Sequence, residues 1–243
     1  MEKKRNDLNV VNIGGYLTTD PVQRDSGIFF TVAVRRDKEN TDFLPVCIRG
    51  ERGKKYTFLK KGSSVVINGH LHQWKGEKGS RLLVDTDRIH FGAVGLNNVV
   101  LTGRLTADPE LFTTNSGKKG YRVSLASERS WKAESGIQSH TSFIDVCVWN
   151  DAMQYVQKGT MCTFIGSLQS RNYQSKDGEN RTAYQVNSSR IAFAPKRDDG
   201  SGEENAPHPA EPEQQNQPSY AEAPHYSAED FEVIDDDDDD LPF

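Results

Sequence analysis

The segment Val11-Asn-Ile-Gly-Gly-Tyr-Leu-Thr-Thr-Asp-Pro21 returns 88 residues later as Val99-Val-Leu-Thr-Gly-Arg-Leu-Thr-Ala-Asp-Pro109. Further matches follow in the same order along the chain: residues 43–49 with 143–149, residues 61–71 with 158–168, and residues 88–91 with 190–193. An ordered series of matches is the mark of a repeated structural unit. The sequence therefore predicts two copies of one domain, at residues 1–94 and 95–195.

Short runs of alternating apolar and polar residues fill each copy. Residues 99–104 and 121–126 alternate in this way, and Lys-Gly or Asp-Gly pairs separate such runs. A period of two broken by turn residues is typical of β-strands. Only residues 151–156 and their counterparts, 51–59, have a helical pattern. This content favours a small closed β-barrel, with the OB-fold, a five-stranded Greek-key barrel, as the leading candidate. The predicted fold class is all-β: two tandem OB-folds followed by a tail.

The charge of the chain is divided unevenly. The net charge is −5, but residues 1–195 hold 28 Lys and Arg against 19 Asp and Glu, whereas residues 196–243 hold 2 against 16. The body is thus +9 and the tail −14. A basic body points to a polyanionic partner. The tail is rich in proline and poor in large apolar residues, so we expect a disordered linker at 196–234 and an interaction tip at 235–243.

Several classes of protein are disfavoured by composition. The apolar runs are only a few residues long, which excludes a membrane-spanning helix. The start of the chain is basic but lacks the apolar segment of a signal peptide. Cys47, Cys147 and Cys162 form no C-x-x-C pair and cannot all pair with one another. We therefore expect a protein of the reducing cytoplasm rather than a disulfide scaffold, with no catalytic cysteine.

Residues 143–149 would present two different faces as a strand, because side chains alternate. The aliphatic face holds Ile144, Val146 and Val148; the other holds Phe143, Asp145, Cys147 and Trp149. In the first copy the same parity puts Leu44, Val46 and Ile48 inside, and Phe43, Pro45, Cys47 and Arg49 outside. Outward aromatic rings among basic residues suit single-stranded nucleic acid, whose bases stack on them. The alternative is that these rings pack against a loop or a second subunit.

Further aromatic residues stand in basic loops. Trp131 lies between Arg129 and Lys132 in an insertion at residues 125–142. Tyr173 precedes an Asp-Gly turn, with Arg171 and Arg181 nearby, and Trp74 has a similar place in the first copy. Loops that join OB strands often line the binding groove. For Trp74 and Tyr173 the alternative is a half-buried strand position.

These motifs give the second copy a strong resemblance to the DNA-binding domain of bacterial single-stranded DNA-binding proteins. The resemblance rests on residues 98–110, on Ser127-Glu-Arg-Ser-Trp131, on Thr141-Ser-Phe143 and on Tyr155-Val-Gln-Lys-Gly159. It covers residues 96–193 closely and 8–91 more weakly. The final Asp-Asp-Asp-Leu-Pro-Phe243 is similar to the acidic C-terminal tip of that family.

The resemblance implies binding of single-stranded DNA with little sequence preference, without enzymatic activity or cofactor, in the cytoplasm in association with the nucleoid. The implied stacking residues are Trp131, Phe143, Trp149 and Tyr173, with Phe43 and Trp74 added from the first copy. The implied partners of the tip are replication, recombination and repair proteins, bound by Asp238, Asp239, Asp240, Leu241, Pro242 and Phe243. The two-domain branch of the family forms homodimers, which bring together four OB-folds.

Basic residues near these rings are the candidates for phosphate contacts: Arg104, Arg122, Arg129, Lys132, Arg171, Arg181, Arg35, Arg36, Lys38 and Arg49. The first copy departs from the family pattern. Its loop between Val34 and Asp42 is short and holds no counterpart of Trp131, and Arg49 stands where the second copy has Trp149. We expect the first copy to contribute phosphate contacts more than stacking, or to serve partly in dimerisation.

Other functions are open to parts of the sequence. Asp85 and Asp87 would share one face of a strand, as the carboxylates of a metal-dependent nuclease could, but the second copy has no matching pair. His70 and His72 lack a third metal ligand in sequence, so we expect surface residues and no metal. An OB protein that binds RNA would use the same stacking chemistry. The acidic tail could also occupy the basic groove and compete with DNA.

Overall fold

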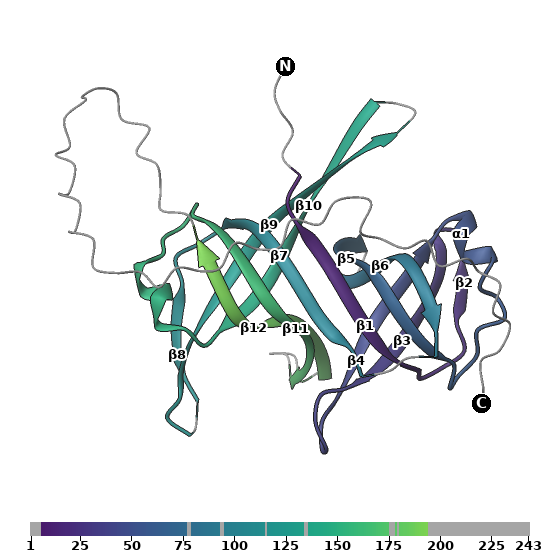
Figure 1. The fold of residues 1–243 in the computed structure, drawn as a ribbon, viewed down its shortest axis with the longest axis horizontal. Helices are drawn as coiled ribbons and strands as arrows, with labels where there is room; N and C mark the ends of the chain where they lie inside the picture. Colours follow the sequence, from purple (N-terminus) through teal and green to yellow (C-terminus); the bar gives the residue numbers. More distant parts are fainter. Residues whose placement is uncertain are drawn as a thin grey trace, which may run out of the picture. The chain divides into compact units, whose positions relative to one another are not determined.

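A computed structural model of the chain describes residues 6–76, 79–92, 95–114, 116–133, 136–174, 178 and 180–193. The predicted disordered linker and the acidic tip lie outside these residues. Figure 1 shows the described strands. The first half holds β1 (Asn9–Leu17), β2 (Val22–Arg24), β3 (Gly27–Arg35), β4 (Thr41–Arg49), α1 (Glu51–Lys54), β5 (Ser64–Gly76) and β6 (Gly79–Phe91). The second holds β7 (Asn97–Leu105), β8 (Glu110–Thr113), β9 (Lys119–Ala133), β10 (Gly136–Val148), the 3-10 helix η1 (Asp151–Tyr155), β11 (Met161–Gln174) and β12 (Asn180–Phe193).

Each half closes a ring of strands. In the first, β1 pairs with β3 and β5, β3 with β4, β4 with β6 in parallel, and β6 with β5. In the second, β7, β9, β10, β12 and β11 pair in the same cycle, again with one parallel contact, between β10 and β12. This is the OB arrangement, so the prediction of two tandem OB-folds is confirmed.

The barrel cores follow the predicted alternation. Leu44, Val46 and Ile48 are at most 1 % exposed, as are Ile144 and Val148. Apolar stripes on successive strands bury one another inside each ring, which is where most of the stabilising free energy of a small barrel comes from.

Cys47 and Cys147 lie on the predicted face but are buried there. They stand on the outward face opposite Phe29 and Arg122 in register, yet they are 0 % and 6 % exposed because aromatic and charged side chains cover that face. Parity fixes the face of a residue but not what covers it. Burial raises the pKa of Cys47 to about 11 and also raises that of Cys147.

The repeated motifs mark equivalent contacts in the two halves. The Asp20 carboxylate accepts the Lys61 amide at 2.8 Å, and the Asp108 carboxylate accepts the Lys158 amide at 2.7 Å. The Asp-Pro and Lys-Gly signals are therefore two sides of one turn contact. The repeated glycines Gly69 and Gly166 sit at equivalent β-bulges, where a Cβ would lie about 2 Å from a carbonyl oxygen on the neighbouring strand.

The two halves join edge to edge. Strand β1 pairs antiparallel with β7 over Asn9–Ile13, so that one 12-stranded sheet runs through both rings. Asn9 exchanges two side-chain hydrogen bonds of 2.9 Å with the backbone of Leu71, and Asn97 does the same with Leu168 at 2.8 Å. Residues 1–197 form one compact unit. The limits at 1–94 and 95–195 stay a prediction, because residues 93 and 94 are not described.

Candidate nucleic-acid interface

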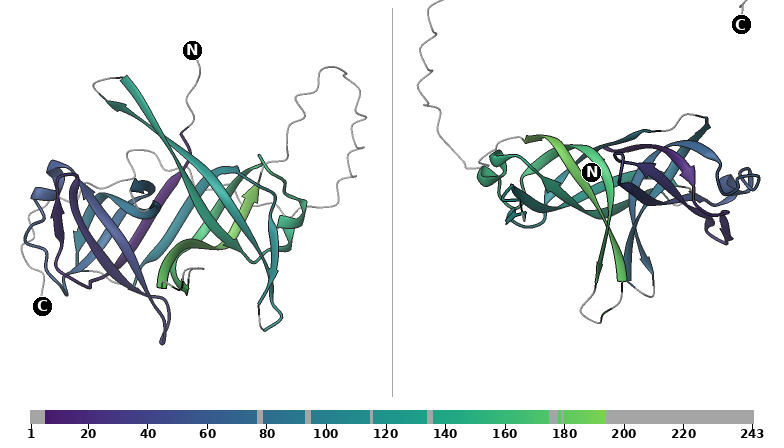
Figure 2. Two further views of the ribbon diagram at one scale, coloured as in Figure 1. Left: turned by 180° about the vertical axis from the view of Figure 1, so that it is seen from behind. Right: turned by 90° about the horizontal axis from the view of Figure 1, so that it is seen from below.

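Three long hairpins extend beyond the rings and carry aromatic candidates. They are β5–β6 with Trp74, β9–β10 with Trp131, and β11–β12 with Tyr173. Figure 2 shows the β5–β6 and β11–β12 hairpins projecting from the same side of the described strands. Trp131 is 47 % exposed and Tyr173 is 41 % exposed, whereas Trp74 is half-buried. Two of these rings thus present a large apolar surface to solvent.

Phe43 and Phe143, each about half exposed, lie beside a hairpin of the opposite half. The Phe43 amide donates to Ser170 Oγ at 3.2 Å, three residues before Tyr173. The Phe143 amide approaches Gln73 Oε1 at 3.4 Å, one residue before Trp74. Each half therefore places its own exposed phenylalanine next to a ring-bearing hairpin of the other half.

Side chains at the residue before each phenylalanine hold these hairpins in place. Asp42 is fully buried, and its Oδ1 accepts the Ser170 amide at 2.8 Å, while the Arg36 guanidinium pairs with the same carboxylate. At the equivalent place, Ser142 Oγ accepts the Gln73 amide at 3.1 Å. The hydrogen bond and charge of Asp42 raise the pKa of Arg36. Arg36 is partly exposed, but its charge is paired with the buried Asp42 carboxylate, so it is a weaker candidate for a phosphate contact.

The outward face of the second half carries aromatic rings and cations in contact with one another. Trp149 meets Phe112 edge-on, with ring centroids 5.4 Å apart, and its Nε1 donates to Asn187 at 2.7 Å. Lys118 Nζ lies 4.5 Å from the Trp149 ring centroid, and the Arg122 guanidinium lies 4.7 Å from that of Phe112. Cations held against ring faces are attracted by the ring quadrupole and remain near any base that stacks there.

The first half has a similar surface with different residues. Trp74 meets Phe29 edge-on at 6.3 Å, Arg24 lies over the Phe29 ring at 5.4 Å, and Arg49 lies over the Trp74 ring at 5.6 Å. The sequence reasoning missed Phe29 and Phe112. The parity argument could have found Phe29, because it alternates with the buried Ile28 and Phe30.

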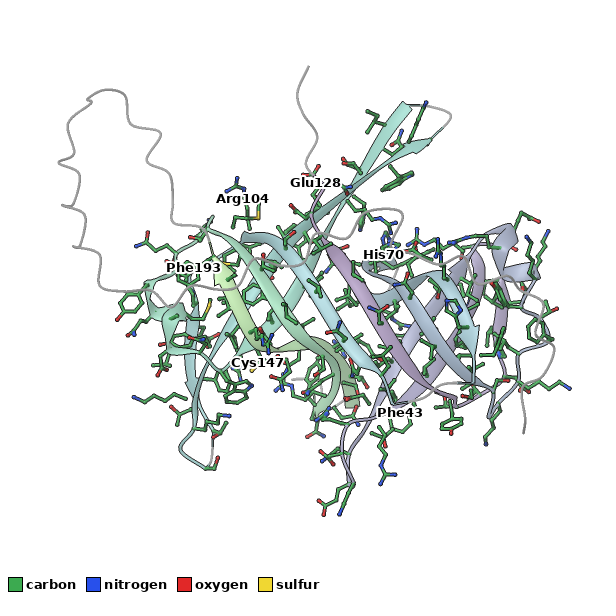
Figure 3. All side chains as sticks on the ribbon, in the orientation of Figure 1. Phe43, His70, Arg104, Glu128, Cys147 and Phe193 are labelled. Atoms are coloured by element: carbon green, nitrogen blue, oxygen red, sulfur yellow. The ribbon has the colours of Figure 1, made fainter. Side chains whose placement is uncertain are left out.

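The basic candidates differ in what their side chains contact: carboxylates, backbone carbonyls or aromatic rings. Arg49 Nε lies 2.5 Å from Asp85 Oδ2, and Arg129 Nη2 lies 3.5 Å from Asp87 Oδ1. Arg35 donates to the backbone of its own turn, and Arg104, labelled in Figure 3, donates to the Gly159 carbonyl at 3.0 Å, at the Lys-Gly turn. Those near Tyr173 are Arg171, whose guanidinium lies 5.9 Å from the ring centroid, and Arg181, opposite in register. Lys38 and Lys132 are exposed.

The expectation of surface histidines is wrong for His70. It is 8 % exposed, because the β9–β10 hairpin of the second half covers this part of β5, and the Arg129 guanidinium contacts the His70 ring. His72 is half-buried and stacks on His140 of the same hairpin at 4.1 Å. With Asp85 and Asp87 these side chains line a cavity of about 290 Å³ between the halves.

Two closed five-stranded barrels are joined through β1 and β7 and carry aromatic side chains with neighbouring cations on their outward faces. This arrangement defines an OB-type nucleic-acid-binding module. The sequence model of the single-strand binding protein family matches residues 96–194. Single-stranded DNA-binding protein 3 of Clostridium acetobutylicum is 36 % identical over 103 residues, which are 40 % of this chain and 70 % of that protein. Single-stranded DNA-binding protein A of Bacillus subtilis is 35 % identical over 112 residues, 44 % of this chain and 64 % of the relative. The chain belongs to the single-strand binding protein family, whose members are non-enzymatic DNA-binding proteins.

The likeness extends beyond the second half at the level of fold. The crystal structure of the single-stranded DNA-binding protein from Thermus aquaticus aligns with a TM-score of 0.61 over 82 % of this chain and 98 % of that one, at 24 % identity. This match includes the first half, which the family's sequence model does not reach. No helix in the described part of the chain is long and apolar enough to cross a membrane.

Proposed function

We propose that this protein binds single-stranded DNA in a sequence-independent manner, protects it and removes its secondary structure. The observation that carries the proposal is the set of outward aromatic rings, of which Phe43 and Phe143 lie beside a hairpin of the other half and Tyr173 lies beside Arg171. Each base that stacks on such a ring contributes about 1–3 kcal/mol, and any base can do so. The curated relatives are named for single-stranded DNA binding, which supports the proposal.

The available rings are Phe43, Trp131, Phe143 and Tyr173, which are between 41 % and 51 % exposed and need no rearrangement. Trp74 and Trp149 are half-buried, with Arg49 and Lys118 held over their rings. Phosphates are contacted by Lys118, Arg122, Arg171 and Arg181, whereas Arg36, Arg49 and Arg129 are compensated by carboxylates. Compared with the phosphate contacts expected from sequence, this set adds Lys118 and leaves out Arg36, Arg49 and Arg129.

Both halves contribute to one continuous interface. Phe43 is held beside the β11–β12 hairpin and Phe143 beside the β5–β6 hairpin, so a strand stacked on either phenylalanine lies next to the opposite half. The first half thus takes part in stacking through Phe43 and Trp74. Two copies of the chain form a homodimer with four such rings of strands, as the family resemblance implies.

We further propose that the tip at 235–243 recruits replication, recombination and repair proteins. The six aspartates at Asp235–Asp240 would meet basic surfaces, and Leu241, Pro242 and Phe243 would supply an apolar anchor. This part of the proposal is supported by the sequence and the resemblance alone.

A fluorescence titration tests the binding proposal. Tryptophan emission is followed while oligo(dT), duplex DNA of the same length or oligo(rU) is added at several salt concentrations. We expect quenching by oligo(dT) that persists at moderate salt, weaker quenching by duplex, and a smaller signal after Trp131→Leu. Equal binding to duplex that disappears with salt would mean a generic basic surface, and tighter binding of oligo(rU) would favour RNA.

A further inference from the structure

His70, His72 and Asp85 converge on one point of the outward face of the first half. His70 and His72 alternate on β5 and so share a face, and Asp85 lies directly opposite His70 on β6. The potential ligand atoms of these residues all lie within 4.8 Å of one another. We propose that this trio binds a transition-metal ion of the Zn²⁺ type; Figure 3 labels His70.

The chemistry of the trio matches that of known metal sites. Two imidazoles and one carboxylate from neighbouring elements are ligands that zinc and related ions accept, with the remaining coordination positions left open. All three side chains line the cavity of about 290 Å³ between the halves. The fold supplies the third ligand that the sequence lacked, because the pairing of β5 with β6 brings Asp85 across from His70.

A carboxylate orients one of the imidazoles. Asp87 Oδ2 lies 3.2 Å from His70 Nδ1, while His70 Nε2 lies 3.6 Å from Asp85 Oδ2. A carboxylate on the far nitrogen of a metal-binding histidine fixes its tautomer and strengthens it as a ligand. Arg129 also contacts Nδ1, so an ion on Nε2 requires that Asp87, and not Arg129, becomes the hydrogen-bond partner of Nδ1.

One carboxylate oxygen of Asp85 is buried without a hydrogen-bond partner among the described residues. The residue is 5 % exposed, and the unmatched oxygen is Oδ1, whereas Oδ2 faces Arg49. Buried polar atoms are almost always satisfied, so an unmatched one points to a bound group. His72 is half-buried beside the Asp85 carboxylate and is held by stacking on His140.

The second half shows that the fold does not need these side chains. In the same register Ser167 replaces His70, Gln169 replaces His72 and Asn187 replaces Asp85. The same ring of strands closes there with neutral residues. The trio in the first half is therefore an addition to the OB-fold and not a requirement of it.

Neighbouring cations limit the affinity of the site. Arg49, Arg52 and Arg129 line the same cavity; a bound ion competes with Arg49 for Asp85, and the charge of Arg129, which contacts His70 Nδ1, opposes the charge of the ion. We therefore expect weaker binding than at a structural zinc centre with four protein ligands. Nitrogen-rich donors also predict a preference for Co²⁺ and Zn²⁺ over Mg²⁺ and Ca²⁺.

Co²⁺ titration of the full-length chain tests the proposal without DNA. We expect one equivalent of Co²⁺ to give a visible absorption band that Zn²⁺ removes. The band should be lost and affinity should fall at least about 10-fold in His72→Gln and Asp85→Asn, the residues of the second half. His90→Gln, which removes an exposed histidine elsewhere on β6, should bind as the wild type does.

The acidic tail is present in every variant, so ions bound there cancel in the comparison. Zn²⁺ should also raise the melting temperature of the wild type and of His90→Gln but not of His72→Gln, since an ion that binds only the folded state stabilises it. Equal Co²⁺ binding by wild type and His72→Gln, or no band beyond that of the hydrated ion, would overturn the proposal. Either result leaves single-stranded DNA binding untouched.

Discussion

Asp42→Ala should loosen the contact between the halves, and its cost can be worked out from the structure. The fully buried Asp42 carboxylate accepts from the Ser170 amide at 2.8 Å, from Ser170 Oγ at 3.3 Å and from Arg36 Nε at 2.9 Å. Removing one partner of a buried ion pair costs about 3–5 kcal/mol. Because the Arg36 side chain is 33 % exposed and can regain water, we take about 2 kcal/mol for the pair.

The Ser170 amide adds to this cost. Without Asp42 it lies in a partly buried contact with its acceptor removed, which costs about 1–2 kcal/mol. The expected loss is therefore about 3–4 kcal/mol in the free energy of unfolding. Asp42→Ser should cost only about 2 kcal/mol, because a serine hydroxyl can accept from the Ser170 amide, as Ser142 Oγ accepts from the Gln73 amide at the equivalent place.

Urea unfolding followed by far-UV circular dichroism measures these values. Arg36→Met in the wild-type and Asp42→Ser backgrounds completes a double-mutant cycle, whose coupling energy should be about 2 kcal/mol. A loss below about 1 kcal/mol for Asp42→Ala, or a coupling energy near zero, would refute the reasoning.

Three other outcomes are expected. Phe143→Ala should weaken oligo(dT) binding about 5-fold to 100-fold by loss of one stacked base, as measured by fluorescence anisotropy, whereas Tyr155→Ala, which removes a ring that is 77 % exposed on η1, should change it little. Deleting residues 196–243 should tighten binding at low salt and have little effect at high salt, since screening removes the attraction of the tail for the body; equal affinity at low salt would exclude competition. Burial raises the pKa of Cys162 to about 11, so native protein should react slowly with a thiol reagent and reveal all three buried thiols only on unfolding.

The core and the strand order could be predicted from the sequence because both depend on local pattern. Alternation with a period of two assigned Val46 and Val146 to the barrel interior, and the repeat gave the number of rings. The residues of the outward faces follow from the same alternation, but what covers those faces does not, so the pattern predicts the face of Cys47 and not its burial. What lies above a strand depends on distant segments.

The contacts of the candidate site depend on register between remote strands. Asp42 and Ser170 are 128 residues apart, and His70 and Arg129 are 59 apart. Nothing local distinguishes Arg36, Arg49 or Arg129 from an arginine that faces solvent. The phosphate contacts predicted from sequence therefore include arginines that are paired with carboxylates. For the same reason, local pattern predicts surface positions for the histidines on β5.

Because β1 and β7 belong to one chain, the two sides of the junction between the halves can have different residues. When two copies of a single domain meet about a two-fold axis, every substitution occurs on both sides at once. Here Asp42 and Arg36 hold one hairpin, while Ser142 holds the other. Likewise His70 and Asp85 stand on one face, and Ser167 and Asn187 on its equivalent. In a covalent pair, one half can thus carry side chains that the other half does without.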